Sequence, residues 1–314
     1  MKLILTGATG FIGKEILEKV KSFDVNVIGR SKPKMNDGYT FFHASIDADS
    51  DYGSALADGG VVIHSAARAH VMDDNSADPL TAFREVNTIG TINLAKQAAQ
   101  AGVKRFIFIS SIKVNGEHTN RNKPFSAEDK PSPEDPYGLS KAEAEEQLKK
   151  LSKETGMAVV IIRPPLVYGP GVKANFAIMM RLAATGIPLP FGGIKENRRS
   201  LVSVYNLVDL IFSCISHPNA ANQTFLVSDD EDLSTAKMLK KLSVALGKSS
   251  KMLSLPVKLF DVLGKITGNS AIVDRLCGSL QVDISKTKEL LDWQPPFSVK
   301  EGFARTAEYY LNNK

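Results

Sequence analysis

The sequence predicts an α/β fold, in which a doubly wound parallel sheet precedes a smaller, mostly helical C-terminal lobe. As far as about residue 165, short apolar runs alternate with longer segments of helical periodicity. The apolar runs are continuous, which is typical of parallel strands that helices cover on both faces. Beyond residue 165, prolines interrupt this rhythm and helical segments predominate. Such sheets bind ligands at the carboxyl ends of their strands, so we expect the site there.

The first part of the chain contains the segments expected to form the sheet and its covering helices. Ile12, Ile16 and Val20 share one face of the first helix. Asp–Pro pairs start the two longer helices and glycines end them, as capping preferences predict. The expected strands are 2–6, 25–29, 61–64, 105–110 and 157–163, and the expected helices are 11–20, 78–102 and 135–156.

The second part of the chain lacks a regular alternation. It contains one expected strand, 224–227, and the expected helices 174–185, 205–216, 235–246, 256–266 and 299–311. We therefore divide the chain into residues 1–165, which also receive part of 200–230, and residues 166–314. The second unit is expected to interleave with the first and to cover the ligand edge of the sheet.

The composition limits the kinds of ligand that the protein is expected to bind. Hydrophobic residues make up 43% of the 314 residues, enough for a large core. The net charge is +5, with Lys and Arg spread among Asp and Glu, which favours a small anionic ligand over nucleic acid. The five histidines and two cysteines show no ligand spacing, so no metal site is expected. The opening apolar run is too short for a signal peptide and no stretch could span a membrane, so we expect a cytoplasmic protein.

The glycines of LTGATGFIG form the first candidate site, because they lie between the first expected strand and the first helix. Gly7 permits a tight turn, Gly10 lets the backbone approach a diphosphate, and Gly13 lets the helix pack on the strand. The helix N-terminus adds favourable electrostatics for an anion. The spacing and its strand–turn–helix context predict a Rossmann-type dinucleotide-binding domain.

The end of the second strand bears on which dinucleotide binds. An acid at this place would bind the ribose hydroxyls of NAD. The sequence instead reads VIGRSKPK, with Arg30 where the acid is expected. A guanidinium can bind a 2′-phosphate through two hydrogen bonds, so NADP(H) is the preferred cofactor, with NAD(H) possible. The alternative is that Arg30 is a solvated loop residue.

Tyr137 and Lys141 are the candidate catalytic pair, since their spacing of four residues places them on one face of the helix expected at 135–156. A phenol titrates near pH 10, too high for acid–base catalysis at neutral pH. A neighbouring ammonium favours the phenolate and should lower the pKa of Tyr137. Such a pair is also common on helix surfaces, so its meaning depends on the rest of the sequence.

Three motifs together resemble those of the extended short-chain dehydrogenase/reductases, especially the enzymes that act on nucleotide sugars. They are GxxGxxG, a strand that ends in Ser110-Ser111, and YxxxK. The resemblance extends through VIHSAA, RPPLVYGPG, NRRSLVSVYNLVDL and DISKTKELLDWQP, and so covers nearly the whole chain. It implies that Ser111 hydrogen-bonds the sugar oxygen at carbon 4, that Tyr137 gives or takes its proton, and that Lys141 binds the nicotinamide ribose.

The same resemblance assigns further residues. It places Phe11, Ile12 and Ala66 with the glycines at the cofactor, and gives Asn87 a supporting role near the site. Arg199 and Arg275 would bind the diphosphate of a UDP-sugar, although Arg275 could also be a charge on a helix surface. The family also implies a homodimer formed by the helix at 80–101 and the helix that carries Tyr137.

The residues after Ser111 bear on the reaction. The family's 4,6-dehydratases have an acid pair where this sequence has Ile112 and Lys113. Isoleucine transfers no proton and lysine carries the opposite charge, so the sequence argues against a dehydratase. Val114-Asn115-Gly116 replaces the Val-Tyr-Gly frequent in the family, and the asparagine expected after the strand at 61–64 is missing from HSAAR.

Two reactions remain. A 4-ketoreductase would reduce UDP-2-acetamido-2,6-dideoxy-hexos-4-ulose to UDP-N-acetylquinovosamine, a step in making surface polysaccharides. A UDP-hexose 4-epimerase would keep its cofactor bound, oxidise carbon 4 and reduce it from the other face. Arg30 favours the reductase, and the stretches FISSIKVNGE and NRRSLVSV resemble those of bacterial reductases that make UDP-N-acetylquinovosamine. A non-catalytic NAD(P)-binding regulator is a more remote alternative, because Tyr137 and Lys141 are both retained.

Overall fold

The largest element of the fold is a parallel sheet. The structure is a computed structural model that describes residues 1–20, 23–34, 38–69, 78–120, 123–268 and 270–313. The sheet has seven strands in the order β3-β2-β1-β4-β5-β6-β9, and every neighbouring pair is parallel. The order reverses between β1 and β4, which is where such sheets bind ligands. The strands are β1 Lys2–Thr6, β2 Asp24–Gly29, β3 Thr40–His43, β4 Gly59–His64, β5 Arg105–Ile109, β6 Ala158–Arg163 and β9 Thr224–Leu226.

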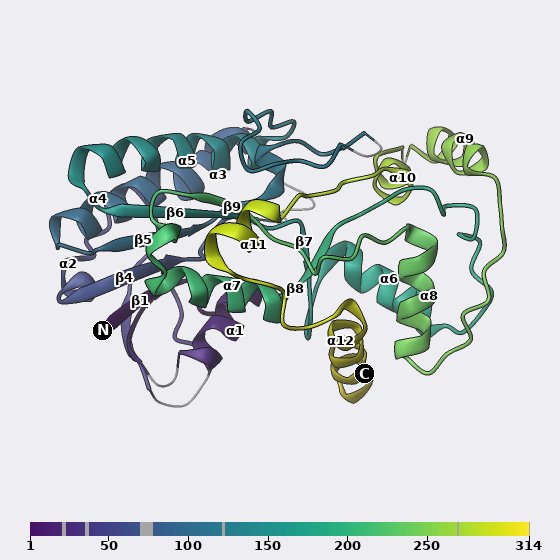
Figure 1. The fold of residues 1–314 in the computed structure, drawn as a ribbon, viewed down its shortest axis with the longest axis horizontal. Coiled ribbons are helices and arrows are strands. Elements are labelled where there is room, and N and C mark those ends of the chain that lie inside the picture. Colours follow the sequence, from purple (N-terminus) through teal and green to yellow (C-terminus); the bar gives the residue numbers. More distant parts are fainter. Residues whose placement is uncertain (21–22, 35–37, 70–77, 121–122, 269, 314) are drawn as a thin grey trace.

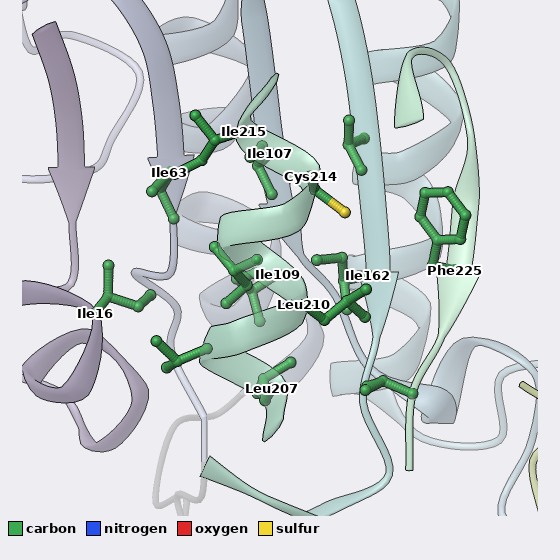
Figure 2. Packing of buried hydrophobic residues seen from close by; sticks show 14 of the residues in the cluster. Ile16, Ile63, Ile107, Ile109, Ile162, Leu207, Leu210, Cys214, Ile215 and Phe225 are labelled. Carbon is green, nitrogen blue, oxygen red and sulfur yellow. The ribbon is translucent and has the colours of Figure 1, made fainter. Parts of the chain in front are cut away.

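Helices cover both faces of the sheet (Figure 1). One face packs against α1 (Phe11–Lys19) and α7 (Val204–Ser216), and the other against α2 (Gly53–Leu56), α4 (Thr91–Gln100) and α5 (Pro136–Thr155). Ile107 and Ile109 point to the first face, where α7 covers them (Figure 2), while Phe106 and Phe108 point to the second. Because alternate residues enter two cores, the strands are apolar throughout.

Apart from α7, β9 and α11 (Ser285–Leu291), the second part of the chain forms a lobe beside the sheet (Figure 1). It contains the parallel strand pair β7 (Leu166–Tyr168) and β8 (Leu201–Ser203) and a separate core in which Tyr168 stacks on Phe176 and Phe303 meets both rings edge-on. Its helices are α6 Ala174–Ala184, α8 Thr235–Ala245, α9 Val257–Thr267, α10 Ser270–Cys277 and α12 Val299–Asn312, while α11 contacts the sheet strand β9.

The predicted fold class is confirmed, with a correction to one long helix. The segment expected at 78–102 starts at Pro79, with Asp78 as its cap, but consists of α3 (Pro79–Arg84), a π-helical turn at Glu85–Gly90 (η1) and α4. The strands β3, β7 and β8 and the helices α2, α10 and α11 were not predicted. None of the helices in the described ranges has the length and apolarity needed to cross a bilayer.

Candidate active site

The turn between β1 and α1 is built around glycine. Gly7 has φ +74°, and a Cβ there would lie 2.6 Å from the backbone nitrogen of Ala66. A Cβ on Gly13 would lie 2.0 Å from the Gly7 carbonyl oxygen, so the helix can approach the turn only without one. Gly10 is exposed and is the N-cap of α1, without a side chain to cover it, which leaves the helix N-terminus open to an anion. This cradle fits the diphosphate of a dinucleotide.

A buried histidine fixes the loop after β4 beside this turn, and the sequence reasoning missed it. The His64 ring bridges the hydroxyls of Thr6, at 2.7 Å, and Thr91, at 2.9 Å. The Thr6 hydroxyl also accepts from the Ala66 amide. Burial, helped by the charge of Lys141, lowers the pKa of His64 to about 3, so its ring is neutral. Ala66 is therefore held against Gly7 at the switch point of the sheet.

The other residues expected at the cofactor lie around the same turn. Phe11 and Ile12 are half-buried at the start of α1 and pack against the core below it. Arg30 is exposed and directly follows β2, the strand that pairs with β1. Arg30 is thus near the end of the strand expected to carry the ribose-binding residue, with its side chain in solvent.

Ser111 and Tyr137 meet where β5 ends and α5 begins. Ser111 caps the short 3-10 turn Ile112–Val114 (η2), and its side chain lies close enough to the phenol of Tyr137 to lower the pKa of that phenol. Asp135 caps α5 by accepting from the Gly138 amide at 2.6 Å, which sets the start of the helix that presents Tyr137. Two side chains expected to act on one oxygen atom are thus in contact.

Tyr137 and Lys141 do not interact as the sequence suggests. The pKa of Tyr137 is raised to about 12 by burial and by the charge of Asp135, with the Ser111 hydrogen bond opposing. Lys141 is buried, donates to the carbonyl of Ile109 at 2.8 Å and lies 4.2 Å from the ring centre of Phe108. Burial lowers the pKa of Lys141 to about 7, and the nearby Glu145 opposes this. The expected lowering of the Tyr137 pKa is absent because the ammonium is directed at β5.

Asn87 lies in the π-helical turn and is fully buried. Its side-chain oxygen accepts from the amide of Arg68 at 2.9 Å, and its nitrogen donates to the carbonyl of Arg68 and to the hydroxyl of Ser140. Ser140 in turn donates to the carbonyl of Tyr137. Asn87 therefore ties the loop after β4 to the first turn of α5, in agreement with a supporting role.

The residues of the stretch SSIKVNG after β5 have different environments and contacts. Ile112 is buried in the core, and Lys113 is paired with Glu117 and Asp135. Asn115 is buried, donates to the carbonyl of Ser126 and accepts from Arg163, each at 2.9 Å. Asn115 is thus a structural residue. We call residues 109–117 and 135–145 together the catalytic edge.

Arg199 and Arg275 lie next to each other in the second lobe. The Arg199 guanidinium donates to the carbonyls of Arg275, at 3.0 Å, and Gly278, at 3.2 Å. Burial and the charge of Arg275 lower the pKa of Arg199, while Glu117 of the catalytic edge opposes this. The Arg275 side chain is exposed. These two residues, here called the arginine pair, form a cationic site near the catalytic edge that suits an anion.

Comparisons with known proteins agree with this geometry. Residues 3–228 match the family model for the NAD dependent epimerase/dehydratase family. A Vibrio cholerae protein named UDP-glucose 4-epimerase is 56% identical over 317 residues, covering 99% of this chain and 97% of that protein. An Escherichia coli O157:H7 protein named N-acetyl-alpha-D-glucosaminyl-diphospho-ditrans,octacis-undecaprenol 4-epimerase is 28% identical over 98% of this chain and 94% of its own.

A solved structure resembles the whole fold. The crystal structure of a UDP-glucose 4-epimerase with UDP-glucose from Thermotoga maritima is 25% identical and has a TM-score of 0.80, with 99% of each chain covered. Within the described residues, no group of three or more His, Cys, Asp or Glu side chains is arranged to hold a metal ion. The chain belongs to the NAD dependent epimerase/dehydratase family of extended short-chain dehydrogenase/reductases.

Proposed function

We propose that this protein is a UDP-hexose 4-epimerase that uses UDP-glucose or UDP-N-acetylglucosamine. The observation that carries the proposal is the 56% identity, over 99% of the chain, to a protein named UDP-glucose 4-epimerase. The 4-ketoreductase favoured by the sequence now stands second, because the relatives described above are named as 4-epimerases.

The side chains of the catalytic edge account for proton transfer in this reaction. A nicotinamide cofactor, when bound, would supply the hydride chemistry at carbon 4 of the sugar. Tyr137 takes the proton of the carbon 4 hydroxyl and gives it back, and Ser111 hydrogen-bonds the same oxygen. Lys141 would hold the ribose of the cofactor. The high pKa of Tyr137 suits returning the proton, whereas removing it needs positive charge nearby.

The arginine pair is assigned to the diphosphate of the UDP-sugar. Binding energy from this remote group holds the sugar at Tyr137 while leaving the ring free to turn between the two hydride transfers. In this division residues 1–165, with part of 200–230, bind the cofactor, and residues 166–314 bind the nucleotide sugar.

A 4,6-dehydratase is not proposed. The positions of the required acid pair hold Ile112, which is buried in the core, and Lys113, which is bound by two carboxylates. Neither side chain can remove a proton from carbon 5.

A parallel assay tests the function directly. The purified protein is incubated with UDP-glucose or UDP-N-acetylglucosamine without added cofactor, and separately with UDP-2-acetamido-2,6-dideoxy-hexos-4-ulose and NADPH. Interconversion of the 4-epimers without added cofactor is expected. NADPH consumption in the second reaction alone would overturn the epimerase in favour of the reductase.

Sedimentation at equilibrium in the same buffer tests the proposed homodimer through α4 and α5.

Arg30 is the basis of the proposed preference for NADP(H) over NAD(H). Fluorescence titration of the protein with NADPH and with NADH measures both affinities. Arg30→Ala is expected to weaken NADPH binding about tenfold, the value of one charge-assisted contact, and to leave NADH binding unchanged. Tighter binding of NADH by the unaltered protein would show that Arg30 is a solvated loop residue.

A further inference from the structure

A buried polar network joins the catalytic edge to β6. Its centre is Glu145, which is 2% exposed and lies one turn after Lys141 on α5. The carboxylate accepts from the Ser110 hydroxyl at 2.5 Å and binds the Arg163 guanidinium, with Nη2 at 2.6 Å and Nε at 2.9 Å. Arg163 also donates to Asn115 at 2.9 Å. None of these four residues is accounted for by the proton transfer at carbon 4.

The network fixes the strand end that presents Ser111. Two successive residues of β5 and its extension are bound from α5: Lys141 donates to the Ile109 carbonyl at 2.8 Å, and Glu145 accepts from the Ser110 hydroxyl. Arg163 holds the far side of the same segment through Asn115. Ser111 is the next residue after these two bonds, so its position toward Tyr137 depends on them.

Glu145 is also the carboxylate that acts on the charge of Lys141. The neighbours of Lys141 are Glu145 on its own helix, neutral His64 from β4, and the Phe108 ring and Ile109 carbonyl from β5. The cation of Arg163 lies behind Glu145 on β6. Among these described groups, Glu145 is the anion nearest to Lys141, and it opposes the effect of burial on the lysine.

We propose that Glu145 is a positioning residue for catalysis, which holds Ser111 toward Tyr137 through Ser110 and places a negative charge one helical turn from Lys141. This inference rests on the catalytic roles proposed above for Ser111, Tyr137 and Lys141. It distinguishes Glu145 from a purely structural partner of Arg163, because a structural carboxylate would affect stability without changing the titration of the site.

Glu145→Gln tests the charge, with Glu146→Gln as a matched control because Glu146 is the next residue and is exposed. After removal of the cofactor that copurifies with the protein, the affinity for NADH is measured by fluorescence from pH 6 to about pH 9. For Glu145→Gln, the upper pH limit of NADH binding is expected to fall by about one unit or more, because a nearby carboxylate no longer favours the ammonium. An unchanged limit in folded Glu145→Gln would overturn this part of the proposal. A downward shift of similar size in Glu146→Gln would do the same.

Two further variants keep the proposal testable if Glu145→Gln fails to fold. Glu145→Asp retains the charge and is expected to retain the pH limit of the unaltered protein. Ser110→Ala removes the hydroxyl but leaves Glu145 paired with Arg163, and is expected to lower kcat about tenfold with no change in the pH limit. Unchanged kcat in Ser110→Ala would refute the positioning of Ser111. If the unaltered protein shows no epimerase activity, the proposed function fails, while the NADH titrations still judge Glu145.

Discussion

The catalytic edge and the arginine pair both contain buried or half-buried cations, but the two regions compensate these charges differently. At the catalytic edge, carboxylates of the protein bind Lys113 on two sides, and the adjoining Arg163 is paired with Glu145. At the arginine pair, Arg199 donates to backbone carbonyls, and the neighbouring guanidinium of Arg275 affects its pKa more than the carboxylate of Glu117 does. The first region is neutralised by its own residues, and the second is left cationic.

This difference separates cations that hold the structure from cations that suit a ligand. A buried charge is costly unless a partner of opposite charge and hydrogen bonds compensate it. Where the protein supplies the partner, the cation is already satisfied and adds little to binding. Where a second cation lies nearby, an incoming diphosphate would relieve the repulsion. Substitutions at the catalytic edge should therefore change kcat, and substitutions at the arginine pair should change KM.

Tyr137→Phe should give the largest effect. It removes the group that transfers the proton, so kcat for epimerisation is expected to fall by about 10²- to 10⁴-fold. The contact between the ring and Phe83 is kept, so folding and NADH affinity should not change. Steady-state kinetics and NADH fluorescence measure the two quantities. A variant that retained a tenth of the activity would show that another group transfers the proton.

Arg275→Ala tests the expectation that the arginine pair binds the substrate. Its side chain is exposed, so the fold should tolerate the change. Loss of a charged contact to the diphosphate should raise KM for the UDP-sugar by about 10- to 100-fold and leave kcat unchanged. Arg181→Ala, an exposed arginine on α6 of the same lobe, serves as the control. Equal KM values for the two variants would remove Arg275 from the substrate site.

The sequence predicted the fold best where elements are long and bounded by strong signals. The Asp135 cap and the left-handed Gly156 delimit α5 as expected, and the continuous apolar runs of β1 and β5 are found in the sheet. The elements that were missed are short. The strands β7 and β8 have three residues each and form only when a distant segment pairs with them, so no local periodicity marks them.

The residues of the candidate site show the same difference between local and long-range signals. Gly7, Ser111 and Tyr137 belong to local motifs with a defined spacing, and they were predicted from it. Glu145 and Arg163 were missed because each acquires its role from a partner far away in the sequence, such as the 48 residues between Asn115 and Arg163. Asn115 replaces a residue frequent in the family, and that departure could have marked it, but only the structure identifies its partner.

Lys113→Met should give the smallest effect, and it most directly tests whether a cation paired with protein carboxylates is structural or binds the ligand. The carboxylate of Asp135 raises the pKa of Tyr137, and the ammonium of Lys113 lies against that carboxylate. Without Lys113 the negative charge acts more strongly, so the pKa of Tyr137 rises further and less phenolate forms at a given pH. The rising limb of kcat against pH should move to higher pH, and kcat at pH 8 should fall about two- to fivefold.

The matched control for Lys113→Met is Lys150→Met, a 78% exposed side chain in a surface pair with Glu154. No change is expected there, since exposed pairs contribute little. Because Lys113 is satisfied by the protein, KM for the UDP-sugar should stay constant in Lys113→Met. A rise in KM without a shift of the pH profile would mean that Lys113 contacts the substrate despite its two carboxylates. Pairing with protein acids would then no longer separate structural cations from ligand-binding ones in this molecule.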